Sequence, residues 1–146
     1  AIPLSVAQMA QLLPNAVHSN NLTQLLWTKL AVNCAINPLT ALLNSTNAIV
    51  LEPEHLPAIK LVLTEVCQVA NAMDIDLDLQ SLIEKVLNVA RQTSANTSSM
   101  LQDIQNGKPT EIDFINGYVV AQGKYFGIPT PKNASLVEQI KQLVLH

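Results

Sequence analysis

Glycine is nearly absent from most of this sequence. The 146 residues contain four glycines, all of them between positions 107 and 127, so the first 106 residues have none. Tight hairpin turns need glycine because few other residues adopt positive φ without steric cost. Loops that bring the backbone close to phosphate need it as well. The absence therefore disfavours a β protein, and it excludes a conventional nucleotide-binding motif from this chain.

Basic side chains and long apolar runs are also scarce. The chain has 8 Lys and Arg against 11 Asp and Glu, a net charge of −3, and a single arginine, Arg91. A nucleic-acid-binding protein must neutralise phosphates with basic side chains, so that class of function is excluded. No apolar run approaches the roughly 18 residues that span a membrane. The two cysteines, Cys34 and Cys67, lie in apolar runs, and we interpret them as reduced core thiols.

Hydrophobic residues make up 49% of the chain and charged residues 13%, and the length is typical of one domain. The spacing of the apolar residues is helical almost throughout. We therefore predict a single all-α domain over residues 1–146, a helical bundle of about six or seven helices with no sheet. Pro38 predicts a kink or break near Asn37, inside the longest helix. The predicted helices cover approximately residues 5–13, 22–43, 54–73, 78–93, 100–104, 111–126 and 133–145.

Two patterns resemble metal sites, and neither is complete. Asp74, Asp76 and Asp78 have the spacing that begins a calcium loop. However, Leu79 stands where that loop needs glycine, and Lys85 stands where it needs glutamate. We interpret the aspartates as an acidic cluster at a helix start, which the helix dipole stabilises. The three histidines are far apart in the sequence and no cysteine stands at ligand spacing, so no metal site is predicted.

Three polar residues interrupt the apolar helix predicted over residues 22–43. Lys29, Asn33 and Asn37 stand at i, i+4 and i+8, which places them on one face over roughly 12 Å. One interpretation is structural: the amides pair with neighbouring helices and the lysine extends to solvent. The other is a small-molecule site, because a ketone that accepts hydride needs a cation near its oxygen to stabilise and protonate the developing alkoxide.

Residues 29–42, KLAVNCAINPLTAL, resemble a signature of the C-terminal domain of the ketopantoate reductase (2-dehydropantoate 2-reductase) family. A second signature stands at the family's spacing, in residues 96–104, NTSSMLQDI, and 110–117, TEIDFING. The resemblance covers about residues 4–145. It implies the helical C-terminal fold that this family shares with 6-phosphogluconate dehydrogenase. It also implies a cytoplasmic oxidoreductase of pantothenate biosynthesis, which reduces ketopantoate to pantoate with NADPH.

The resemblance implies two catalytic residues. Lys29 matches the family's catalytic lysine, the acid that protonates the carbonyl oxygen of the substrate as NADPH delivers hydride. Glu111 matches a glutamate that lies beside this lysine and the cofactor, so it is expected in both catalysis and cofactor binding.

The resemblance also implies four substrate-binding residues. Asn33 and Asn37 match two asparagines that hold the hydroxyl and carboxylate end of the substrate, and Asn47 matches a third substrate-contacting asparagine. Ser99 matches a serine that contacts the substrate carboxylate. Asn96, in the same motif, is expected at a helix start and not as a ligand.

The family's enzymes also have an N-terminal Rossmann domain, which carries the glycine-rich turn and most contacts to NADP. We therefore expect residues 1–146 to be the substrate domain alone, inactive by itself. Its expected partners are ketopantoate and that Rossmann domain, with a homodimer as a further option and no nucleic acid or membrane. Two alternatives stay open: a non-catalytic helical dimerisation or interaction module, and a related 2-keto acid reductase with another substrate.

Overall fold

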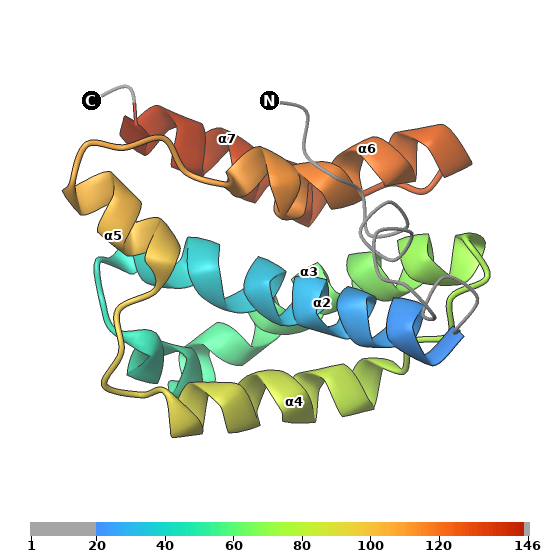
Figure 1. The fold of residues 1–146 in the computed structure, drawn as a ribbon, viewed down its shortest axis with the longest axis horizontal. Coiled ribbons are helices and arrows are strands. Elements are labelled where there is room, and N and C mark those ends of the chain that lie inside the picture. The colour runs from blue at the N-terminus through green and yellow to red at the C-terminus, as the bar shows by residue number, and fades with distance from the viewer. Residues whose placement is uncertain (1–19, 145–146) are drawn as a thin grey trace.

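The computed structural model describes residues 20–144, and every regular element within that range is a helix (Figure 1). The all-α class predicted from the sequence is therefore confirmed. The helix predicted over residues 5–13 lies outside the described residues. In chain order, with η for short 3₁₀ helices, the elements are α2 (Asn20–Leu43), η1 (Asn47–Leu51), η2 (Pro53–His55), α3 (Leu56–Ala72), α4 (Leu79–Gln92), α5 (Ser99–Gln105), η3 (Ile112–Phe114), α6 (Asn116–Phe126) and α7 (Pro131–Val144).

Helix α2 forms the centre of the bundle because it is apolar on nearly every side. It contacts α3, α4, α5 and α7, and Figure 1 shows it between α4 on one side and α6 and α7 on the other. Trp27 and Cys34 are fully buried along it, and Val32 and Ile36 are buried as well. The ring centroids of Trp27 and Tyr118 of α6 lie 5.8 Å apart. Any polar side chain on the inner part of α2 therefore lies against the core.

Of the kink or break predicted near Asn37, the break does not occur, because α2 continues through Pro38 to Leu43. Proline has no backbone N–H, so Pro38 leaves the carbonyl oxygen of Cys34 without its helical donor. The side chain of Asn116, at the start of α6, donates from Nδ2 to this oxygen at 3.1 Å. A distant side chain thus replaces the missing helical hydrogen bond.

The single helix predicted over residues 111–126 is wrong in its first part, where the structure has η3 and then α6. The chain bends between them at Ile115, whose φ of −109° and ψ of −94° are not helical. Gly117 allows α6 to begin close to η3, since a Cβ atom there would lie only 3.2 Å from the carbonyl oxygen of Ile112. The bend leaves Glu111 on a separate segment in front of α6.

A buried polar network holds the start of α7 against α3. The carboxylate of Glu65 in α3 is buried and accepts from the backbone N–H groups of Lys132 and Asn133, both at 2.9 Å. Asn133 Nδ2 donates to the same carboxylate at 2.8 Å, and Asn133 Oδ1 accepts from Asn116 Nδ2 at 2.9 Å. A charged acceptor therefore satisfies N–H groups in the first turn of α7, where the helix dipole favours negative charge.

Two helix starts have side-chain caps. Asp78 precedes α4, and its carboxylate accepts from Ser81 N at 2.8 Å and from Ser81 Oγ at 2.9 Å. These bonds, the backbone one first, lower the pKa of Asp78, and they confirm its interpretation as a helix start. Ser98 precedes α5, and its Oγ accepts from Leu101 N at 3.2 Å. The helix start expected at Asn96 therefore lies two residues later, at Ser98.

Candidate functional site

Three of the six predicted site residues line one small hollow. Asn37 comes from α2, Ser99 is the first residue of α5, and Glu111 precedes η3. They are far apart in the sequence, and they meet because α5 packs on α2 and the bend before α6 leaves the segment of Glu111 nearby. The complete lining is Asn37, Ser99, Met100, Asp103, Glu111 and Ile115.

The hollow combines hydrogen-bond donors with acidic acceptors. The Asn37 amide and the Ser99 hydroxyl can both donate, and the carboxylates of Asp103 and Glu111 can accept. Asp103 was not among the predicted site residues. Its position one helical turn after Ser99, at i+4, was the signal that could have found it.

The polar face of α2 continues from this hollow towards the start of the helix. Lys29 is exposed, Asn33 is half-buried, and Asn37 is 9% exposed, so burial increases along the face. The side chains of these three residues make no hydrogen bond or ion pair with any residue of the range 20–144. Among the described residues the amides therefore lack the helix partners that the structural interpretation expects, whereas the exposure of Lys29 agrees with that interpretation.

This lack of partners has an energetic meaning. A buried amide without a partner costs about 1–3 kcal/mol on protein mutational scales. Asn37 avoids this full cost: it is nine-tenths buried and lines the hollow, but the side-chain atoms buried without a partner in the described residues are Asn47 Oδ1 and Asn116 Oδ1. The Asn37 amide therefore still reaches solvent and is free to bind a polar ligand. Lys29 adds an ammonium group on the same face, two turns away, which no carboxylate of the described residues neutralises.

Asn47 lies elsewhere. Its Nδ2 donates to Thr93 Oγ1 at 2.9 Å, and its backbone N–H donates to the carbonyl oxygen of Asn96 at 3.0 Å. Its side-chain Oδ1 is buried without a partner. Asn47 does not line the hollow, and its visible role is to hold the connection between α4 and α5, which leads into Ser99.

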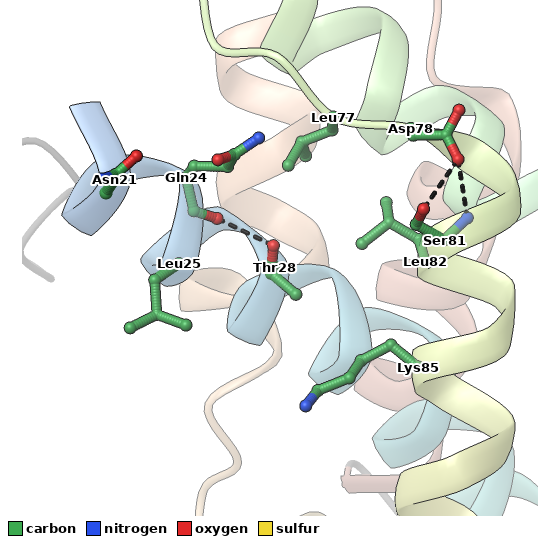
Figure 2. Close-up of a pocket in the computed structure, with 9 residues that line it drawn as sticks. All are labelled: Asn21, Gln24, Leu25, Thr28, Leu77, Asp78, Ser81, Leu82 and Lys85. Atoms are coloured by element: carbon green, nitrogen blue, oxygen red, sulfur yellow. Dashed lines mark hydrogen bonds between the residues drawn. The ribbon is translucent and has the colours of Figure 1, made fainter.

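A larger pocket lies between the first half of α2 and the start of α4 (Figure 2). It has a volume of about 490 Å³, whereas the hollow at Asn37 is a narrow depression without a measurable cavity volume. None of the predicted site residues lines it. Several of its polar groups are already bonded: Thr28 Oγ1 donates to the carbonyl oxygen of Gln24 at 2.8 Å, and Asp78 binds Ser81. Size alone does not make it the functional site.

The described residues contain no group of side chains that could bind a metal ion. No three His, Cys, Asp or Glu residues between positions 20 and 144 are placed to hold a metal ion. None of the helices in that range is long and apolar enough to cross a bilayer. Cys34 and Cys67 are free thiols and buried, as predicted.

The sequence and the fold both match known proteins. A family model described as "Ketopantoate reductase PanE/ApbA C terminal" matches residues 21–144. A 2-dehydropantoate 2-reductase of Vibrio cholerae is 50% identical over 120 residues, which are 82% of this chain and 40% of that protein.

Two solved structures have a similar fold. A probable 2-dehydropantoate 2-reductase from Bacillus subtilis is 38% identical, with a TM-score of 0.75, over 82% of this chain and 40% of that one. A D-mandelate dehydrogenase, solved with NADH and anilino(oxo)acetate, is 28% identical, with a TM-score of 0.81, over 86% of this chain and 42% of that one. The chain thus spans about two fifths of the length of the relatives that it matches.

Proposed function

Because this chain belongs to the ketopantoate reductase C-terminal family, we propose that it is the substrate-binding part of an NADPH-dependent 2-dehydropantoate 2-reductase. The reaction would reduce ketopantoate to pantoate, in pantothenate biosynthesis. The observation that carries the proposal is the polar face of α2. Its three side chains have no partner among the described residues, and the face ends in a hollow that Ser99 and Glu111 also line.

Lys29 is proposed to donate a proton to the carbonyl oxygen of the substrate. Its ammonium is exposed and has no carboxylate partner in the described chain, so its charge is available to a developing alkoxide. General acid catalysis needs such a group within hydrogen-bond reach of the oxygen. A bound NADPH would supply the hydride.

The amides and the hydroxyl are proposed to hold the polar end of the substrate. Asn33 and Asn37 follow Lys29 along α2, where their amides can bind a hydroxyl and a carboxylate. Ser99 can donate to the same carboxylate from the other side of the hollow. Asn47 stays a proposed ligand through the family resemblance, although its amide nitrogen already bonds Thr93.

Glu111 is proposed to orient Lys29 and to contact the cofactor. Its carboxylate is exposed at the hollow, where it can accept from an ammonium group or from a ribose hydroxyl. The other contacts to NADP must come from elsewhere, because this chain has no glycine-rich turn over its first 106 residues. We propose that an N-terminal Rossmann domain supplies them and that this chain alone has no reductase activity.

A related 2-keto acid reductase with a different substrate is the second candidate. The fold similarity to a D-mandelate dehydrogenase favours it, because the same helical scaffold then serves more than one oxidoreductase.

The test uses the longer protein of which we propose this chain to be part. The wild type is assayed with NADPH against ketopantoate and several branched and aromatic 2-keto acids, and the variant Lys29→Ala is compared with Lys60→Ala, an exposed lysine of α3. Lys29→Ala should lower kcat by about 10²–10⁴-fold, the usual range for one general acid, and Lys60→Ala should leave it unchanged. Preference for another 2-keto acid would select the second candidate. No turnover of any 2-keto acid would support a non-catalytic module instead.

A further inference from the structure

Two buried hydroxyl groups join α2 to the start of α5. Thr40 is fully buried and Ser98 is 6% exposed, and their Oγ atoms lie 2.7 Å apart. Thr40 stands one turn after Asn37 on α2, and Ser98 immediately precedes Ser99. Neither Thr40 nor Ser98 lines the hollow itself.

The number of protons determines the direction of these hydrogen bonds. Thr40 Oγ1 lies 3.0 Å from the carbonyl oxygen of Asn37 as well as 2.7 Å from Ser98 Oγ, but a hydroxyl has one proton. The carbonyl oxygen can only accept, so both bonds form together when Thr40 donates to Asn37 and Ser98 donates to Thr40. Ser98 Oγ then keeps a lone pair for Leu101 N, which donates to it at 3.2 Å.

The result is a continuous bridge from the α2 backbone at Asn37 to the first turn of α5. Helix α5 has seven residues and packs mainly on α2. Its buried residues, Met100 and Leu101, make apolar contacts that have little directional preference. The hydroxyl bridge is directional, and it therefore sets where Ser99 stands relative to Asn37.

We propose that Thr40 and Ser98 are positioning residues for substrate binding, because their hydroxyl bridge holds Ser99 Oγ and the Asn37 side chain at the spacing that the substrate requires. This inference rests on the proposed function, since it concerns the same site. It assigns a role in substrate affinity to two residues that do not touch the substrate.

The central variant is Thr40→Val, which keeps the shape of the side chain and removes the hydroxyl. In the full-length reductase it should raise KM for the keto acid about tenfold, comparable to one lost hydrogen bond to a charged group, with kcat within threefold of wild type. Thr40→Ser restores the hydroxyl and should restore KM. The matched control is Thr64→Val, because Thr64 Oγ1 donates to the carbonyl oxygen of Lys60 within α3, away from the hollow.

A double variant separates the bridge from a general loss of stability. Ser98→Ala removes the bridge together with the cap of α5, so adding Thr40→Val to it should raise KM no further. Thermal midpoints are measured for all variants. If Thr40→Val lowers the midpoint but leaves KM as in Thr64→Val, or if the two KM effects add, the proposal is overturned.

Failure of the proposed function would look different. In that case the wild type itself would not reduce ketopantoate, or Lys29→Ala would retain full kcat, whatever Thr40→Val does. If Thr40→Val does not fold, the comparison of Thr40→Ser with Ser98→Ala decides: the first should keep wild-type KM and the second should not. Equal KM values for these two variants would end the assignment.

Discussion

Asn116 Nδ2 donates to the carbonyl oxygen of Cys34 at 3.1 Å, and this is the carbonyl that Pro38 deprives of its helical donor. The same amide group also donates to Asn133 Oδ1 at 2.9 Å. One side chain therefore completes α2 and links α6 to α7. The repaired turn of α2 includes Asn37, which lines the hollow.

Asn116→Ala should destabilise the protein by about 1–3 kcal/mol, since it leaves a buried carbonyl oxygen without a donor. Pro38→Ala restores a backbone N–H at position 38, which can donate to Cys34 in the normal helical pattern. Asn116→Ala should therefore lower the free energy of unfolding by less when Pro38→Ala is already present. Urea unfolding of the wild type, the two single variants and the double variant measures the coupling between Asn116 and Pro38. Strictly additive effects would show that the two residues act independently.

Glu65→Ala should be among the most destabilising single substitutions in the described chain. It removes the acceptor of two backbone N–H groups and of Asn133 Nδ2, of which the Lys132 N–H is partly buried and the other two donors are buried. A buried donor left without its acceptor costs about 1–3 kcal/mol, and this substitution leaves three donors without theirs. Glu138→Ala, at an exposed carboxylate of α7, is the control and should stay within about 0.5 kcal/mol of wild type. Equal unfolding free energies for the two variants would contradict the structural role of Glu65.

Asn37→Ala and Ser99→Ala should act on substrate binding more than on turnover. Each removes a proposed hydrogen bond to the substrate, so KM for the keto acid should rise by about 2- to 150-fold while kcat changes less. Steady-state kinetics of the full-length protein measure this. Asn88→Ala, at an exposed asparagine of α4, is the control for a change of residue type. A fall in the thermal midpoint with an unchanged KM would instead assign both residues to folding.

The two thiols should reduce stability at alkaline pH. Burial raises the pKa of Cys34 far above its usual range, and burial together with the charge of Asp78 raises the pKa of Cys67 to about 11. Unfolded thiols lose their protons from about pH 8.5, whereas the folded thiols keep theirs. The unfolded state then binds fewer protons, so the unfolding free energy falls as pH rises, by up to about 1.4 kcal/mol per pH unit and thiol.

Urea unfolding between pH 7 and pH 11 measures this slope. The double variant Cys34→Ala, Cys67→Ala loses both thiols, so its unfolding free energy should fall less steeply than that of wild type above pH 8.5. Parallel curves for the two chains would rule out a thiol contribution.

Much of the fold could be predicted because its causes are local. The apolar spacing in α3 and α4 and the Asp78 cap depend on residues within a few positions of one another. The i, i+4, i+8 pattern also placed Lys29, Asn33 and Asn37 correctly on one face of α2. The family resemblance then named three residues that do line one hollow, although α2, α5 and the segment before η3 are distant in the sequence.

Two of the features that sequence reasoning missed depend on distant partners, and a third, the bend at Ile115, is local. Pro38 predicted a kink or break because Asn116, which supplies the missing donor to Cys34 from 82 positions away, was invisible to a local rule. The bend at Ile115 arises where α6 packs closely on η3, a contact that helical spacing does not encode. The pairing of Asn47 with Thr93 joins η1 to the end of α4, so the local sequence around Asn47 contains no sign of it.

Trp27 is the single tryptophan of the chain, fully buried, and its ring faces Tyr118 across the contact between α2 and α6. The protein therefore contains its own fluorescent reporter, two residues before Lys29. Excitation at the red edge of the tyrosine band selects this one indole, and its emission comes from an apolar, water-free environment. A shift of that emission to longer wavelength marks entry of water between α2 and α6, and a change in intensity on adding a keto acid marks a movement of the helix that carries the polar face. Both can be followed in real time without attaching a dye.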